Sequence, residues 1–181
     1  MQSFQMFIRT TGRRVVIAGG GGQAAQKARL MLKTDAALIL VAPEFDAELA
    51  GLVAQNRATH YVGKVTPDRF ANTALVFIGT GCPGIDACLH KLAKDAGALV
   101  NVVDQPGLCD ATTRSTVDRD PVGVAIGTEG AAPVLARPIK TQIETMPDPT
   151  LGACAALALA TQPKNRRQVK PLESLSKSCR E

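Results

Sequence analysis

Short apolar runs alternate with amphipathic segments through the first two-thirds of the chain. The apolar runs predict strands at 15–18, 37–41, 59–62, 74–78 and 99–103. Apolar residues at helical spacing predict intervening helices at 23–33, 47–56 and 85–96. Asp46 is a suitable N-cap for the second helix, and Gly97 supplies a stop after the third. This order favours a parallel sheet with helices on both faces.

The pattern changes after residue 104. A turn at 105–107 precedes two expected strands at 112–117 and 122–126, and these are followed by an expected helix at 132–145. Pro133 suits the first turn of that helix, whereas Pro138 lies inside it and should kink or shorten it. An alanine-rich segment at 151–160 is also expected to be helical, and a polar, basic tail follows from residue 162.

Four consecutive glycines stand between the first expected strand and the first expected helix. They fit the pattern Gly19-x-Gly21-x-x-Ala24 of a dinucleotide-binding strand–turn–helix. Gly19 would permit the tight turn, Gly21 would let a pyrophosphate approach the backbone, and Ala24 would let the helix pack close to the strand. The helix N-terminus would offer free N–H groups to the phosphates. The alternative is a glycine turn with a structural role only.

The fold class predicted here is therefore α/β, a Rossmann doubly wound parallel sheet followed by a small α+β extension. We expect a dinucleotide-binding domain at 1–112, the extension at 113–161 and a basic C-terminal tail at 162–181. An extension of two strands and a helix has too little mass to form its own core. We expect it to bury its apolar face against a second copy of the chain, as a homodimer.

Asp104 follows the fifth expected strand directly. In an open α/β sheet the ligand binds outside the carboxyl ends of the strands, so this carboxylate would lie beside a bound dinucleotide. Aspartate is also common in turns, and Asp104 opens an Asp-Gln-Pro-Gly sequence. Both interpretations, a reactive carboxylate and a turn residue, stay open at this point.

Composition narrows the class of protein. The 181 residues are 45% apolar, which is typical of a globular domain, and only 3% aromatic, which disfavours stacking platforms for nucleic acid. The net charge of +5 suits an anionic ligand, although part of the excess lies in the tail. The five cysteines include no Cys-x-x-Cys pair, so neither a disulfide framework nor a metal site is indicated. With no signal-peptide pattern and no apolar run of membrane-spanning length, we expect a cytoplasmic protein.

Four segments together resemble one known family. They are the glycine-rich turn with Ala24 and Lys27-Ala28-Arg29, the run Asn101-Val102-Val103-Asp104, Asp118-Arg119 followed by Pro121, and the stretch from Thr128 to Arg137. This combination resembles the siroheme synthase N-terminal domain family. The members of that family are precorrin-2 dehydrogenases and often also sirohydrochlorin ferrochelatases. The resemblance covers residues 13 to about 145.

The resemblance implies that the chain uses NAD⁺ to oxidise precorrin-2 to sirohydrochlorin in siroheme biosynthesis, with Asp104 as the catalytic group. It leaves open whether the chain also inserts iron as Fe²⁺. Cofactor contacts are expected at nine residues: Gly19, Gly21, Gly22, Gln23, Ala24, Pro43, Glu44, Thr80 and Asn101. Contacts to the anionic tetrapyrrole are expected at Arg114, Arg119, Thr128 and Arg137, although each arginine could equally be an ordinary surface charge.

Other classes of function remain open at the level of the sequence. Glu44 stands near the place where an acidic residue meets the adenosine ribose, but it could equally be an exposed loop residue. No arginine directly follows the second expected strand, and this favours NAD over NADP. A dinucleotide-binding sensor without chemistry would share the same glycine-rich turn. A different short oxidoreductase is a further alternative, although the only tyrosine, Tyr61, belongs to no Tyr-x-x-x-Lys pair.

Overall fold

The computed structural model describes residues 4–119, 122–127 and 133–145. The strands are β1 (Arg14–Ala18), β2 (Ala37–Val41), β3 (Thr59–Tyr61), β4 (Thr73–Ile78), β5 (Val100–Val102), β6 (Ser115–Arg119) and β7 (Val122–Ile126). The α-helices are α1 (Gly22–Met31), α2 (Ala47–Ala54), α3 (Pro83–Asp95) and α4 (Pro133–Thr145). Short 3-10 helices lie at Pro67–Arg69 and Pro106–Leu108. The described chain divides into two compact units, one of residues 5–113 and one that takes Phe4 and the residues from Arg114 onwards.

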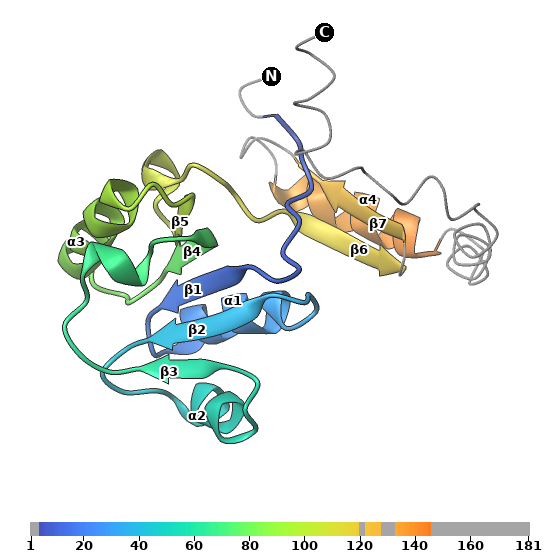
Figure 1. Cartoon of the computed structure of the whole chain (residues 1–181). Helices are drawn as coiled ribbons and strands as arrows, with labels where there is room; N and C mark the ends of the chain where they lie inside the picture. The colour runs from blue at the N-terminus through green and yellow to red at the C-terminus, as the bar shows by residue number, and fades with distance from the viewer. Residues whose placement is uncertain (1–3, 120–121, 128–132, 146–181) are drawn as a thin grey trace, which may run out of the picture. The chain divides into compact units, whose positions relative to one another are not determined.

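The larger unit is built on a five-stranded sheet in the order β3-β2-β1-β4-β5, and every neighbouring pair is parallel. Successive parallel strands need a crossover, and a helix serves this purpose after β1, β2 and β4. The direction of winding reverses between β1 and β4, because β2 and β3 lie on one side of β1 and β4 and β5 on the other. Figure 1 shows the sheet with its helices. The predicted Rossmann fold class is confirmed.

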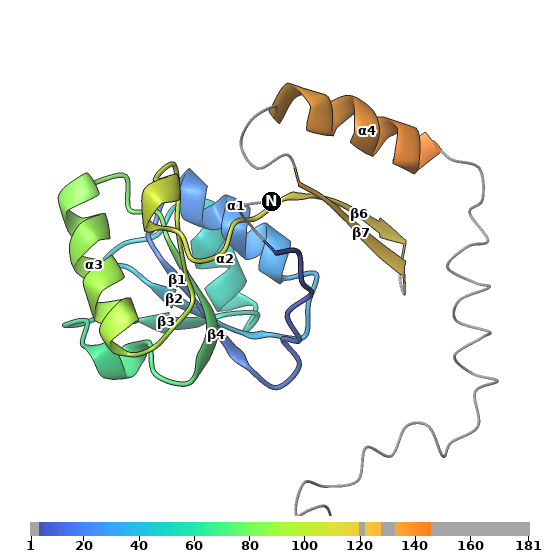
Figure 2. The same cartoon turned by 90° about the horizontal axis from the view of Figure 1, so that it is seen from above.

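Both faces of the sheet are buried. Val15 and Ile17 of β1 pack with α1 and α2 in one apolar cluster. Val16 and Ala18 point the other way and pack with α3 in a second cluster. Each of these four side chains is fully buried, which explains why β1 is apolar at consecutive positions and does not alternate. Figure 2 shows α3 on one side of the sheet and α1 and α2 on the other.

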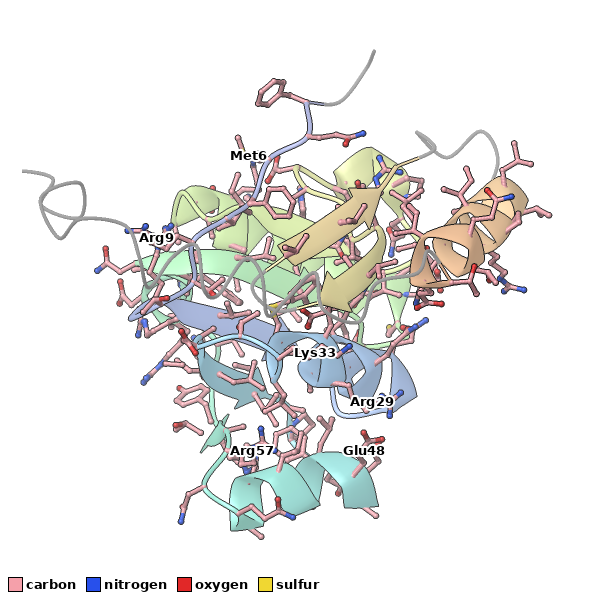
Figure 3. The ribbon with its side chains drawn as sticks, turned by 90° about the vertical axis from the view of Figure 1, so that its right-hand side faces the viewer. Met6, Arg9, Arg29, Lys33, Glu48 and Arg57 are labelled. Atoms are coloured by element: carbon pink, nitrogen blue, oxygen red, sulfur yellow. The ribbon has the colours of Figure 1, made fainter. Side chains whose placement is uncertain are left out.

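The two helices on the same face are also joined at their surface. Arg29 on α1 and Glu48 on α2 form an ion pair with a nitrogen–oxygen distance of 2.6 Å. Figure 3 shows the two side chains facing each other. Because both side chains are largely exposed, the pair adds about 0–1 kcal/mol to the free energy of unfolding. The apolar contacts beneath it determine how α1 and α2 pack.

The described part of the smaller unit contains an antiparallel hairpin and a helix. β6 pairs with β7 from Ser115↔Ile126 to Arg119↔Val122. Val117 of β6 and Ala136 of α4 are buried. Val134, Leu135 and Ile139 of α4 are exposed large apolar residues. The helix therefore presents apolar side chains that the described residues leave uncovered.

Two sequence predictions for the smaller unit need correction. The first strand runs from Ser115 to Arg119, so it begins three positions after the expected start. Its bounds are those of its pairing with β7, in which Ser115 pairs with Ile126 and Arg119 with Val122. Pro138 does not shorten α4, which continues to Thr145. Proline removes one N–H donor from the helix, and Pro138 itself is exposed. The expected helix at 151–160 and the tail lie outside the described residues.

The larger unit contains a glycine that no other residue can replace without movement of the backbone. A Cβ built at Gly20 would lie 1.9 Å from the carbonyl oxygen of Glu44. We therefore expect Gly20→Ala to lower the free energy of unfolding by about 1–3 kcal/mol, as overpacking does. The matched control is Gly22→Ala, where a Cβ meets no atom within 4 Å at the first position of α1. It should leave stability unchanged or raise it by up to about 1 kcal/mol, as measured by urea denaturation. Equal loss in both variants would contradict this packing.

Candidate functional site

The carboxyl ends of the parallel strands meet at one edge of the sheet. The amide of Gly19, just after β1, donates to the Val41 carbonyl at the end of β2 at 3.0 Å. On the other side, the amide of Gly79 donates to the Ala18 carbonyl at 2.9 Å. The loops that follow β1, β2, β4 and β5 therefore start close together. This edge, at the point where the winding reverses, is the usual ligand site of an open α/β sheet.

The glycine-rich turn packs tightly against the loops on both sides. Gly19 has φ +139°, a backbone conformation that favours glycine, and a Cβ there would lie 2.3 Å from the Gly79 carbonyl oxygen. The same Cβ would lie 3.3 Å from the Cβ of Ala24, which is buried in α1. These contacts have the geometry predicted for the first and last positions of the fingerprint.

Gly21 and Gly22 are different, because the protein itself does not require glycine at either position. Gly21 is the N-cap of α1 with φ −106° and ψ −170°, an extended conformation that any residue adopts. A Cβ at either position would meet no atom within 4 Å. The absence of side chains leaves open space directly in front of the helix N-terminus.

The N-terminus of α1 has the properties of a phosphate site. The amide of Ala25 makes the first hydrogen bond within the helix, to the Gly21 carbonyl at 3.0 Å, so the amides before it have no partner inside the helix. The first turn contains no acidic residue. Free amides, the helix dipole and the open space together fit the pyrophosphate of a dinucleotide.

The loop after β2 forms one wall of this edge. The amide of Asp46 donates to the Gly20 carbonyl at 2.8 Å, and the Asp46 side chain accepts from the amide of Leu49 at 2.9 Å. Asp46 is thus the predicted N-cap of α2 and also ties the loop to the glycine-rich turn. Pro43 and Glu44 are exposed in this loop. Their roles in cofactor binding remain predictions.

The loop after β4 forms another wall, and a residue that the sequence reasoning missed holds it in place. Asp86 in the first turn of α3 is buried, with 4% of its surface exposed. Its carboxylate accepts from the Thr80 amide at 3.0 Å and from the Thr80 hydroxyl at 2.7 Å. The hydroxyl of Thr80 therefore donates within the protein, and its predicted cofactor contact would have to use its oxygen as acceptor. The position of Asp86, an acidic residue in the first turn of an expected helix, was the sequence signal that could have identified it.

Asp104 lies beside the glycine-rich turn. Its carboxylate oxygen Oδ2 accepts a hydrogen bond from Nε2 of Gln23, the second residue of α1, at 2.9 Å. The two residues are 81 positions apart in the sequence. Asp104 has φ +60°, the left-handed conformation that aspartate tolerates better than most residues. Asp104 therefore both shapes the turn after β5 and presents a carboxylate next to the start of α1.

A lysine lies one helical turn further along α1. The ammonium of Lys27 donates to the Thr113 hydroxyl at 2.8 Å and lies 5.5 Å from the centre of the Phe77 ring. Burial lowers the pKa of Lys27, whereas the charges of Cys109 and Asp104 act in the opposite direction. The sequence reasoning assigned no role to Lys27. Its spacing of four from Gln23, which places both on one helix face, was the signal that could have found it.

The segment that follows β5 forms hydrogen bonds with β5 and with α3. Nδ2 of the buried Asn101 donates to the Ala111 carbonyl at 2.8 Å, and its Oδ1 finds no partner within the described part of the chain. The carboxylate of Asp110 accepts from Lys94 on α3 and from the amide of Val100. Burial would raise the pKa of Asp110, but these hydrogen bonds outweigh it and lower the pKa below its usual range. The expected cofactor contact of Asn101 stays a prediction.

The residues expected to bind substrate belong to the other unit. Arg114 directly precedes β6, Arg119 ends β6, and Arg137 is exposed on α4. Thr128 lies outside the described residues. In the part of the chain that the structure describes, no group of three or more metal-ligating side chains comes together, and no helix is long and apolar enough to cross a membrane.

Comparison with known proteins agrees with the geometry of this edge. Residues 6–115 match a family described as "Putative NAD(P)-binding". The chain is 40% identical over 161 residues to a siroheme synthase of Pseudomonas putida (strain W619), covering 87% of this chain and 34% of that protein. It is 33% identical over 172 residues to a siroheme synthase of Mannheimia succiniciproducens, covering 95% of this chain and 36% of that protein. The chain thus spans about a third of the length of these relatives.

A solved structure shares the fold. The chain superposes on SirC, a precorrin-2 dehydrogenase, with a TM-score of 0.74 and 21% sequence identity, over 97% of this chain and 86% of that chain. At this identity the likeness supports the fold alone, a five-stranded parallel sheet followed by a small antiparallel hairpin and a helix.

The open space at Gly21 provides a test of the dinucleotide site. Gly21→Val fits the extended backbone and meets no protein atom, but its side chain would fill the space before the amides of α1. We expect the affinity for NAD⁺, measured by calorimetry, to fall at least about 100-fold, or about 2.7 kcal/mol, in a folded protein. Gly51→Val is the control, because Gly51 of α2 also faces open space, away from this edge. Normal NAD⁺ binding by Gly21→Val would place the site elsewhere.

Proposed function

The chain belongs to the family of NAD(P)-binding domains found at the N-terminus of siroheme synthases, and we propose that it oxidises precorrin-2 to sirohydrochlorin with NAD⁺. One observation carries the proposal. The carboxylate of Asp104 lies 2.9 Å from a side chain of the second residue of α1, at the same edge as the glycine-rich turn. This contact supports a proposed dinucleotide site with a carboxylate beside it that would accept a proton.

The glycine-rich turn would hold the cofactor. The amides at the start of α1 bind the pyrophosphate, and the bare backbone of Gly21 and Gly22 gives it room. Glu44, exposed in the loop after β2, suits the ribose hydroxyls and would repel the additional phosphate of NADP. We therefore propose NAD⁺ as the cofactor. When bound, its nicotinamide ring supplies the acceptor for a hydride.

Asp104 completes the reaction. Oxidation of precorrin-2 to sirohydrochlorin removes two electrons and two hydrogens, one hydrogen as the hydride that bound NAD⁺ would accept and the other as a proton. Asp104 accepts this proton and later releases it to water. Because the residue is exposed, solvent can reach the carboxylate for this release. Iron insertion would use the same carboxylate to accept pyrrole protons while Fe²⁺ enters as substrate, and we propose it as an additional activity.

The substrate is a tetrapyrrole with many carboxylate groups, so it needs cationic partners. Arg114, Arg119 and Arg137 are the candidates, with Thr128 as a hydrogen-bonding residue. All four stand in the smaller unit, whereas Asp104 and the glycine-rich turn stand in the larger unit.

Conversion of precorrin-2 is the direct test. Anaerobic incubation with precorrin-2 and NAD⁺ should produce NADH and the absorbance of sirohydrochlorin in step. Asp104→Asn should lower turnover at least about 100-fold, since a lost general base costs about 10²–10⁴-fold, while NAD⁺ affinity stays near that of the wild type. Asparagine tolerates the left-handed backbone, so the turn should be retained.

Two outcomes would contradict parts of this proposal. NAD⁺ binding without any turnover by the wild type would indicate a dinucleotide-binding sensor. Wild-type turnover that Asp104→Asn lowers only a few-fold would make Asp104 a turn residue, and the proton would have to leave to water or to a substrate carboxylate.

The smaller unit supports a proposed homodimer. A hairpin and one helix bury few side chains, and α4 exposes Val134 at 79%, Leu135 at 57% and Ile139 at 39% of their surfaces. We expect a dimer in sedimentation equilibrium at micromolar concentration and a shift to monomer in Leu135→Glu. Val62→Glu, which changes an exposed apolar residue of the larger unit, should leave the dimer intact. A compact wild-type monomer would rule out the dimer.

A further inference from the structure

Gln23 contributes to two functional elements at once. Its backbone amide belongs to the first turn of α1, where the amides face the proposed phosphate site. Its side-chain amide donates to Oδ2 of Asp104 at 2.9 Å. Gln23 is therefore a direct link between the cofactor-binding turn and the proposed proton acceptor.

The Gln23 side chain lies beside Gly79, the residue that follows β4. A Cβ at Gly79 would come within 3.4 Å of the Gln23 Cβ and 3.5 Å of its Oε1, which are ordinary contact distances. The same Cβ would lie 3.0 Å from Cγ2 of Val103, the residue before Asp104, which is tighter than most real contacts. The bare backbone of Gly79 therefore leaves space beside the Gln23 side chain, whose amide bonds to Asp104.

Such a partner matters for Asp104 because its side chain is exposed among the residues that the structure describes. The residue is exposed, and an exposed side chain samples several rotamers. The charged groups that act on it electrostatically include Lys27, whose ammonium is already engaged by Thr113. A hydrogen bond from a neutral amide favours one orientation of the carboxylate without cancelling its charge. The negative charge is what a proton acceptor requires.

We propose that Gln23 is a positioning residue that holds the Asp104 carboxylate against the N-terminus of α1, so that proton acceptor and cofactor site keep one fixed geometry. The inference rests on the proposed dehydrogenase function. It assigns to the Gln23 side chain a role that is separate from any cofactor contact of its backbone.

The substitution Gln23→Met tests this role. Methionine is similar in length and helix propensity but has no N–H donor, so it removes the hydrogen bond and keeps the helix. We expect kcat to fall about tenfold, as a lost hydrogen bond to a charged group predicts, with KM for NAD⁺ within about twofold. Gln26→Met makes the same change at an exposed position of α1 and should behave as the wild type. A normal kcat in Gln23→Met would overturn the inference.

A double-mutant cycle separates positioning from an independent effect. If Gln23 acts through Asp104, Gln23→Met should cause no further loss of turnover in an Asp104→Ala background. A further tenfold loss in the double variant would show that Gln23 acts by another route and would overturn the inference. Equal thermal unfolding midpoints in Gln23→Met and Gln26→Met are the expected evidence that the loss is not one of folding.

An NMR measurement tests the contact between Gln23 and Asp104 independently of any dehydrogenase activity. The side-chain amide signals of Gln23 in a ¹⁵N-correlated NMR spectrum should move in Asp104→Ala and stay in place in Asp68→Ala, which removes an exposed carboxylate from the 3-10 helix at Pro67–Arg69. Unmoved Gln23 signals would overturn the link itself. Moved signals in a wild type that converts no precorrin-2 would leave the contact in place and overturn its catalytic role together with the proposed function.

Discussion

The structure depends on how closely the backbone after β1 approaches the loops after its two neighbouring strands. A Cβ at Gly19 would lie 2.3 Å from the Gly79 carbonyl oxygen, and one at Gly20 would lie 1.9 Å from that of Glu44. Only bare backbone fits on both sides. This approach lets α1 begin at the edge of the sheet where the winding reverses, so the free amides of the helix and the ends of four strands share one small region.

From that position, one face of α1 organises the chain beyond β5. Gln23 contacts Asp104 at the start of this segment, and Lys27, one helical turn later, contacts Thr113 near its end. The smaller unit begins at the next residue, Arg114. Both ends of this segment, Asp104 and Thr113, therefore contact the helix that would bind the pyrophosphate. The smaller unit follows Thr113 directly in the sequence.

Local sequence patterns predict the elements of this fold but not the contacts that build its site. The glycines, the apolar strands and the Asp46 cap are local signals, and the structure contains each of them. The hydrogen bond between Gln23 and Asp104 joins residues 81 positions apart and depends on the pairing of β1, β4 and β5. The start of β6 was misplaced for a related reason, since hairpin pairing with β7 sets it and the local pattern does not.

The conformation of Asp104 connects its two possible roles. A left-handed residue is needed to turn the chain after β5, and glycine or asparagine would serve that purpose as well as aspartate. The turn therefore does not account for a carboxylate. What aspartate adds is a carboxylate beside the start of α1, which accepts a hydrogen bond from the neutral amide of Gln23. The turn after β5 thus determines where Asp104 lies. The turn does not require a carboxylate, so this group is available for proton chemistry.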